Sequence, residues 1–283
     1  MDIKRIRKTA LVLLILFGYT ISTCALFYPT VSNLLNQHRN RRLVSAYEDF
    51  VARMPQEEIR RILDEARAYN RQHRENYIKD AFNEAEDYVL THPYDQLLDP
   101  DGTGIMGYLE IPKIHMTLSI YHGIGKRTLE SGCGHVEGTS LPIGGKSCHA
   151  VLAAHRGLPD AKLFTDLDRM EAGDEFYLHI LDRVYAYRVD RIRVVRPSET
   201  GELRLREGRD LVTLLTCTPY GVNTHRLLVR GHRVPYVPAH AEEQASQAGP
   251  VIPYYLAALA AGMAVILVFL TARWVRRRRK KTG

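Results

Sequence analysis

The chain has 283 residues, of which 45% are hydrophobic and 25% are charged, and this composition excludes a disordered or fibrous protein. The net charge of +7 comes from two short terminal tails, which hold 11 of the 39 basic residues, whereas the segment between them is slightly acidic. A basic excess confined to the tails indicates membrane topology and not a phosphate-binding surface, so no nucleic-acid partner is expected.

Two uncharged apolar runs are each about long enough to cross a bilayer as a helix. They define predicted transmembrane helices at 10–30 and 251–272, with basic cytoplasmic tails at 1–9 and 273–283. Because basic flanks stay on the cytoplasmic side, we expect the chain to be anchored in the lipid bilayer of the cell membrane, with everything between the two helices extracytoplasmic. A cleaved signal peptide is the alternative for the first run, although no good small-residue cleavage site follows it.

The segment 31–103 begins as polar, helix-favouring sequence. Apolar residues recur at three- and four-residue steps between about Val44 and Glu86, which predicts an amphipathic helix. The Pro- and Gly-containing stretch Thr91–Gly104 then marks the boundary of the next domain.

The domain at 104–236 consists of short apolar or alternating runs separated by turn residues. Val, Ile, Leu, Tyr and Thr dominate seven or eight such runs, and this spacing predicts the strands of a barrel or sandwich. The polar stretch 237–250 is predicted to be a linker to the second membrane helix. The fold class is therefore mainly β, with an N-terminal helical segment.

Cys217 ends the strand-like run VTLLTC, and Arg226 begins the next run after the turn TPYGVNTH. Paired as antiparallel strands, these two runs would bring the thiol and the guanidinium side by side. A nearby guanidinium stabilises the nucleophilic thiolate and offers donors to an oxygen that develops negative charge. A buried apolar cysteine and a surface salt bridge are the alternatives that spacing alone leaves open.

His155 ends the apolar run CHAVLAAH, and a turn containing Gly157 and Pro159 follows it. A histidine presented at the end of a strand can carry the proton to and from a leaving amine while a cysteine attacks. A structural histidine is the alternative, because the chain contains 12 histidines.

Taken together, these runs resemble a known family. TLLTCTPYGVNTHRLLVRG closely resembles the active-site signature of sortases, and AHRGLP resembles their catalytic-histidine segment. GHVEGTSLPIGG and GYLEIPKI resemble other segments of the sortase barrel, and the similarity is greatest to class C sortases, the pilin polymerases. The resemblance implies a closed eight-stranded β-barrel with catalytic Cys217, His155 and Arg226, and with Thr216 lining the substrate groove.

The same resemblance implies a function. The chain would be a cysteine transpeptidase that cleaves an LPXTG-like sorting signal between Thr and Gly through a Cys217 thioester. Its partners would be pilin subunits that carry the signal and an acceptor lysine, and it would need no metal and no organic cofactor. A housekeeping sortase that joins surface proteins to cell-wall peptide, and a non-catalytic membrane scaffold, are the alternatives.

Class C sortases often carry a lid with an Asp-Pro-aromatic motif over the active site. The nearest match here is Asp80-Ala81-Phe82, which lacks the Pro. As a lid, Asp80 would pair with Arg226 or approach the thiol, and Phe82 would cover the ring of His155. Ordinary helix residues are the alternative interpretation.

Cys133 and Cys148 flank a connection rich in Pro and Gly. A disulfide between them is one interpretation in an extracytoplasmic compartment, and two separate thiols are another. A zinc site with His135 and His149 is the third, but the Cys-x-His and Cys-His spacings are poor for zinc.

Overall fold

The structure is a computed structural model that describes residues 3–72, 82, 91, 93–247 and 262. The chain divides into two compact units. One comprises Met1–Thr30 with Gly249–Gly283, and the other comprises Val31–Ala248. Each unit is described by itself.

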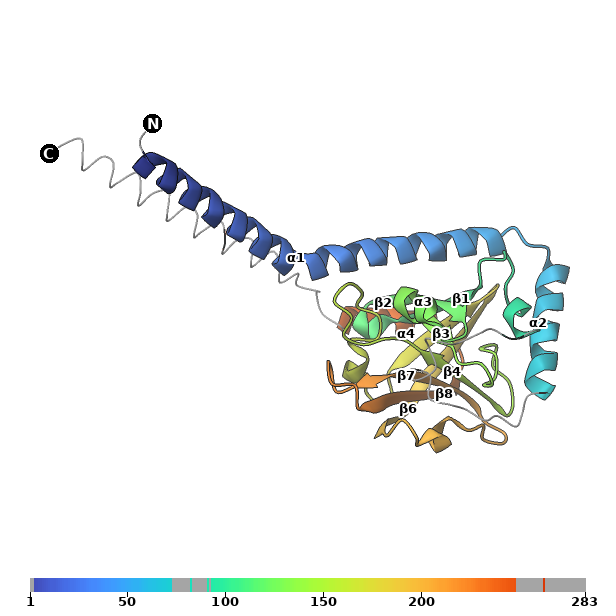
Figure 1. The fold of residues 1–283 in the computed structure, drawn as a ribbon. Coiled ribbons are helices and arrows are strands. Elements are labelled where there is room, and N and C mark those ends of the chain that lie inside the picture. Colours follow the sequence, from blue (N-terminus) through green and yellow to red (C-terminus); the bar gives the residue numbers. More distant parts are fainter. Residues whose placement is uncertain (1–2, 73–81, 83–90, 92, 248–261, 263–283) are drawn as a thin grey trace. The chain divides into compact units, whose positions relative to one another are not determined.

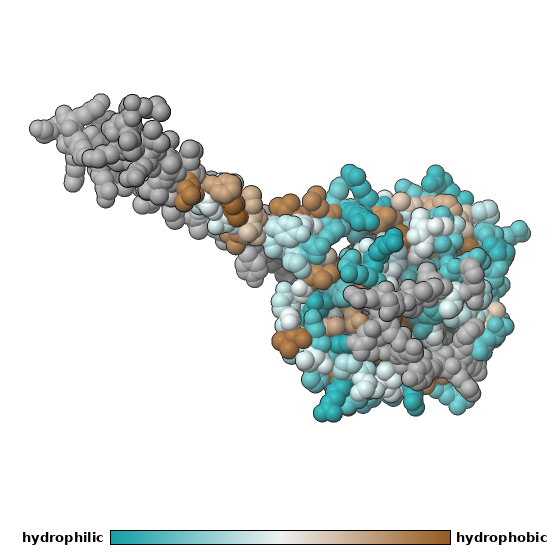
Figure 2. Space-filling view, viewed as in Figure 1, coloured by the Kyte–Doolittle hydropathy of each residue, from teal (hydrophilic) through white to brown (hydrophobic). Residues whose placement is uncertain are grey.

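Helix α1 (Ile3–Val51) contains the first predicted membrane run and Pro29. Between Leu14 and Leu35 it exposes a series of large apolar side chains (Figure 2). Among the described residues, no helix meets the length and apolarity needed to span a membrane. The second predicted run lies outside the described residues except for Gly262. The prediction of two transmembrane helices is therefore not supported by the structure.

Eight strands form a closed barrel in the order β1-β2-β3-β4-β7-β8-β6-β5 (Figure 1). The predicted closed eight-stranded barrel is thus confirmed. The strands are β1 (Ile105–Ile111), β2 (Met116–His122), β3 (Cys133–His135), β4 (Cys148–Ala153), β5 (Glu175–Ile180), β6 (Arg183–Val195), β7 (Asp210–Thr218) and β8 (His225–Val234). Short helices lie between strands: α3 (Lys126–Ser131) and the 3-10 helices η2 (Pro112–Ile114), η3 (Leu167–Arg169) and η4 (Thr200–Leu203).

Most neighbouring strands are antiparallel, but β2 pairs with β3, and β4 with β7, in parallel. The β4–β7 pairing matters for function, because the carboxyl ends of these two strands lie at the same end of the barrel. Whatever follows β4 therefore lies next to the last residues of β7.

Alternate residues of the strands separate into two apolar clusters. The inner cluster, which fills the barrel, receives side chains from all eight strands, among them Val212, Leu214, Leu227 and Val229. The outer cluster lies on the opposite face of β4, β7 and β8 and consists of Ile124, Leu129, Val136, Val151, Ala153, Leu203, Leu215 and Leu228. The period of two along a strand produces this division, since Leu214 and Leu215 point to opposite faces.

The helical segment before the barrel differs from its prediction. Instead of one amphipathic helix there are α1 and α2 (Gln56–Gln72), separated by a turn that contains Pro55. Proline has no N–H to donate and favours a helix start, so it separates the two helices. Tyr47 ties α1 to the barrel by donating to the Met106 carbonyl at 3.0 Å and accepting from the Leu181 amide at 2.8 Å.

The predicted linker 237–250 is also more ordered than expected. Helix α4 (Pro238–Gln247) occupies most of it. Gln244 accepts a hydrogen bond from the Glu175 amide at 3.0 Å, and Ala241 packs against the apolar patch of Tyr177, Ala186 and Val234. These contacts with the barrel stabilise a helix that polar composition alone did not predict.

Candidate active site

Cys217 and Arg226 lie directly opposite each other on the antiparallel strands β7 and β8. Residues opposite each other in such a pair project from the same face, here the face of the outer cluster. Both side chains are nearly enclosed, with exposures of 6% and 5%. The structure therefore brings the thiol and the guanidinium into the arrangement that the sequence predicted.

His155 reaches the same place from β4. The parallel register pairs Ala153 with Leu215, and the Ala154 amide donates to the Leu215 carbonyl at 3.2 Å. His155 follows two residues after the last paired residue of β4, and its ring contacts Phe82, which also lies against Arg226. The backbone at His155 is held by a further hydrogen bond, from the Phe164 amide to the His155 carbonyl at 3.0 Å.

Partial burial determines the charge of His155. Removal from water disfavours the imidazolium and lowers the pKa of His155, whereas the nearby carboxylate of Glu130 acts in the opposite direction. The lowered pKa favours a neutral ring at neutral pH.

The guanidinium of Arg226 is held by backbone carbonyls. Its Nη1 donates to the carbonyl of Asn223, in the turn before β8, at 3.0 Å and to the carbonyl of His225, the first residue of β8, at 3.2 Å. The same group lies over the ring of Phe82, with 5.1 Å between Cζ and the ring centroid. A cation held in this way is already oriented before a substrate arrives.

Phe82 contacts His155 as well, with ring centroids 5.5 Å apart, and packs against the outer cluster. The contact that the sequence suggested between Phe82 and the His155 ring is thus present. Asp80, the other residue of the predicted lid, lies outside the described residues.

Thr216 occupies a different position from the one predicted. Its side chain is fully buried and, by the alternation along β7, points to the face opposite Cys217. The hydroxyl donates to the carbonyl of Ala154 at 2.7 Å. Thr216 therefore does not line a substrate groove; it links β7 to the residue that precedes His155.

Arg156 was missed in the sequence, although it directly follows His155. Its side chain is 8% exposed, donates from Nη1 to the Thr218 hydroxyl at 3.2 Å and forms an ion pair with Asp168. These contacts join the segment after β4 to the residue after Cys217. The position of Arg156 next to the histidine was the only signal, and a surface role explained it equally well.

Cys133 and Cys148 are not joined by a disulfide, which corrects that prediction. Cys133 belongs to the end of β3 that faces the last residues of β4, whereas Cys148 begins β4. The intervening length of strand is about 20 Å, far beyond the reach of a disulfide.

The histidines weighed as zinc ligands have other partners. His135 lies 2.8 Å from the Tyr94 hydroxyl and 2.8 Å from the Ser140 carbonyl, and His149 contacts Arg204 and Thr213. Within the part of the chain that the structure describes, no group of three or more His, Cys, Asp or Glu residues could hold a metal ion.

Comparison with known proteins assigns the class to which this fold and site belong. The sortase domain family matches residues 109–234. A solved structure of sortase C-1 from Streptococcus pneumoniae is 43% identical, with a TM-score of 0.66, and the match covers 69% of this chain and 100% of that one. Sortase C1 from Streptococcus agalactiae is 44% identical, with a TM-score of 0.64, over 71% and 97% of the two chains.

A curated relative, sortase A of Bacillus anthracis, is 29% identical over 134 residues, which are 47% of this chain and 62% of the relative. The match thus spans less than two thirds of that curated protein. The chain belongs to the sortase family of cysteine transpeptidases, and the structural neighbours named here are class C sortases.

Proposed function

We propose that this protein is a pilin-joining cysteine transpeptidase in which Cys217 is the nucleophile, Arg226 stabilises the oxyanion and His155 transfers the proton. The observations that support the proposal are the strand register, which pairs Cys217 with Arg226, and the ring of Phe82, which contacts both the Arg226 guanidinium and the His155 ring. Cysteine, histidine and a fixed cation are sufficient for acyl transfer between amines.

In the first half of the reaction, the Cys217 thiol passes its proton to the neutral His155 ring, and the resulting thiolate attacks the Thr carbonyl of an LPXTG-like sorting signal. Arg226 holds the carbonyl oxygen while it is negatively charged, and His155 gives a proton to the departing Gly amine as the C–N bond breaks. In the second half, a lysine amine of another pilin subunit attacks the thioester and loses its proton to His155. The C–S bond then breaks, which forms an isopeptide bond and restores the thiolate.

Phe82 would act as a lid in this cycle. It contacts both His155 and Arg226 and covers part of the outer cluster, so a peptide that reaches Cys217 must displace it.

Similarity favours pilin as the substrate. The class C structures are 41 to 44% identical to this chain, whereas the curated sortases A are 24 to 29% identical. One S. pneumoniae sortase C structure is described in terms of pilin substrate specificity. Mass spectrometry of the product linkage separates the candidates: a pilin lysine supports polymerisation, and a cell-wall peptide amine supports the housekeeping alternative.

The location at the outer face of a membrane is also a proposal. It is supported by the two apolar runs, their basic flanks and the apolar side chains exposed on α1. Protease treatment of intact cells would test it, since an extracytoplasmic barrel is accessible and a cytoplasmic barrel is protected.

The central experiment replaces Cys217 by Ala in a strain that lacks other sortases. Covalent ladders of pilin should disappear, and ladders that persist would contradict the proposal. A thiol-reactive mimic of the sorting peptide should also modify Cys217 in preference to the other three cysteines. Absence of selective modification would favour the non-catalytic scaffold.

A further inference from the structure

The segment 196–209, between β6 and β7, forms one wall of a cleft beside Arg226, the residue proposed to stabilise the oxyanion. It contains η4, and Leu203 of η4 is 5% exposed and belongs to the outer cluster. The residues that line the cleft include Leu203, Leu215, Arg226 and Leu228. A peptide bound along the outer face toward Cys217 would pass this cleft, and the nearly buried Leu203 would support the wall that the peptide meets.

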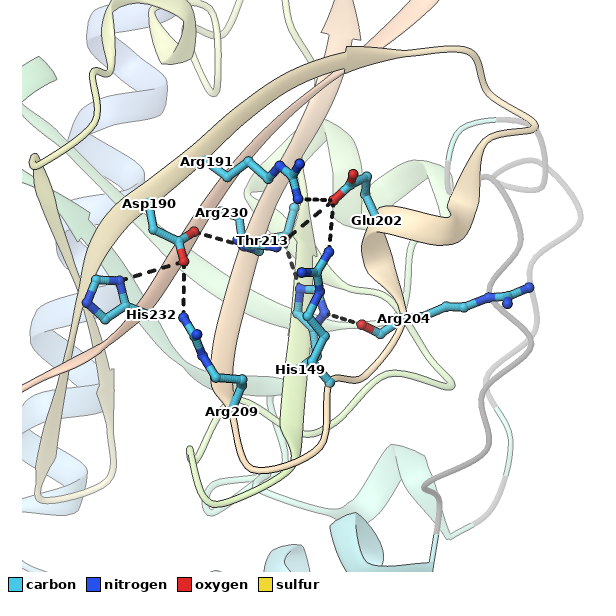
Figure 3. Close-up of polar contacts among 10 residues, drawn as sticks. His149, Asp190, Arg191, Glu202, Arg204, Arg209, Thr213, Arg230 and His232 are labelled. Carbon is cyan, nitrogen blue, oxygen red and sulfur yellow. Dashed lines mark hydrogen bonds and ion pairs between the residues drawn. The ribbon is translucent and has the colours of Figure 1, made fainter.

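Glu202, the residue before Leu203, points away from this cleft toward three arginines (Figure 3). Its Oε2 lies 3.4 Å from Arg191 of β6, 3.3 Å from Arg206 and 4.0 Å from Arg230 of β8. One carboxylate thus joins the segment to two strands of the barrel wall.

Arg230 makes this contact more than a surface ion pair. Its side chain is 10% exposed, and its Nη1 has no hydrogen-bond partner among the described residues, so Glu202 is the charge that faces it. The other side of the guanidinium is fixed by Asp190, 2.8 Å from Nε, and Asp190 also contacts Arg209 and His232 (Figure 3). Without Glu202, Asp190 would still pair with Nε, but the nearly buried Nη1 would lose the carboxylate that faces it.

His149 of β4 holds the segment on the other side of Leu203. Its Nδ1 donates to the Arg204 carbonyl at 3.0 Å, and its Nε2 accepts from the Thr213 hydroxyl at 2.7 Å. This pattern requires the neutral ring, and burial lowers the pKa of His149 to about 4, which keeps it neutral. Leu203 therefore lies between two anchored residues.

We propose that Glu202 is a positioning residue for the donor peptide: through Arg191 and Arg230 it holds Leu203 as the wall against which the apolar part of the peptide binds. The proposal rests on the proposed transpeptidase function. It assigns Glu202 to peptide binding and not to the chemistry at Cys217. Cys217 belongs to β7, whereas Glu202 belongs to η4.

The test is steady-state cleavage of a fluorogenic LPXTG-type peptide by the full-length protein. Glu202→Gln keeps the shape but removes the charge, and we expect KM to rise about tenfold while kcat changes less than about twofold. Alkylation of Cys217 by iodoacetamide, followed by mass spectrometry, should keep its wild-type rate. Glu202→Asp retains the charge and should restore most of the affinity.

Glu58→Gln is the matched control, because Glu58 pairs with Arg61 on an exposed face of α2 and should leave KM unchanged. Leu203→Ala should raise KM by itself, and adding it to Glu202→Gln should raise KM little further, since both act through one wall. An unchanged KM in Glu202→Gln, or a parallel loss of kcat and alkylation rate, would overturn the proposal.

Failure of the proposed function would look different. If the wild-type protein cleaves no sorting peptide, the transpeptidase assignment fails. Amide hydrogen exchange still tests whether Glu202 holds the segment 196–209 against the barrel. Glu202→Gln should then accelerate exchange in 196–209 and not in α2. Unchanged exchange in 196–209 would refute the role of Glu202 without reference to activity.

Discussion

The two faces of the β7–β8 pair differ in what they contribute. The inner face places Val212, Leu214, Leu227 and Val229 in the barrel interior, each almost fully excluded from solvent. The outer face of the same strands carries Leu215 and Leu228, followed by the proposed nucleophile and cation. Because neighbouring residues of a strand point to opposite faces, the chain can separate stability from chemistry within a few positions. Substitutions on the two faces should therefore have different consequences.

The largest effect is expected at Cys217 on the outer face. Cys217→Ala should lower transpeptidation at least about a thousandfold, because no other group can form the thioester. The free energy of unfolding should change by only about 1 kcal/mol, since the side chain is small. Peptide transfer and urea unfolding, measured on one preparation, check both expectations. Retained transfer would contradict the assignment of Cys217 as the nucleophile on the outer face.

Arg226, also on the outer face, should give the next largest loss. Arg226→Lys keeps the charge but not the planar donor pair, and we expect kcat to fall about a hundredfold. Arg193→Lys, at an exposed position of β6, is the matched control and should behave as wild type. A rise in KM alone, with kcat unchanged, would mean that Arg226 contributes to substrate binding and not to stabilisation of the transition state.

Leu214 tests the inner face, one position from the outer cluster. Leu214→Ala should reduce the free energy of unfolding by about 2–5 kcal/mol, because it removes buried carbons and leaves a cavity. The kcat of the folded fraction should stay within a few-fold of wild type. Urea unfolding, with activity measured well below the midpoint, provides the test; a large loss of kcat in folded protein would show that the faces are coupled.

Buried histidines should make the fold sensitive to acid. Burial lowers the pKa of His135 and of His149 to about 4, below the value of about 6.5 in an unfolded chain. Between pH 6.5 and pH 4 the unfolded chain binds protons that the folded protein does not, so stability should fall as the pH falls. The thermal midpoint should decrease through this window, and His149→Gln should make the slope shallower; an equal slope would contradict the assignment.

The smallest effect is expected at Phe82, which covers the outer face. Phe82→Ala should increase the rate of Cys217 alkylation about threefold to tenfold by uncovering the thiol. The buried thiols of Cys133 and Cys148 serve as internal references and should not change. A slower reaction at Cys217 would indicate that Phe82 orders the site instead of shielding it.

Local sequence determined the strands and two of the three proposed catalytic residues. The alternation of the runs around Cys217 and Arg226, and the short turn between them, already specify an antiparallel pair with both side chains on one face. The barrel of 104–236 follows from the same pattern repeated along the chain, together with the resemblance to sortases.

Tertiary structure decided what depends on contacts between distant segments. The parallel pairing of β4 with β7 brings the segment that contains His155 to the end of β7 that carries Cys217, where the Thr216 hydroxyl donates to Ala154. The antiparallel pairing of β3 with β4 separates Cys133 from Cys148. Likewise, the ion pairs of Glu202 form only because β6, β8 and the segment 196–209 bring three arginines close to its carboxylate. Strand periodicity is a local property of neighbouring residues, whereas strand order and buried charge pairing depend on which distant segments the closed barrel brings together.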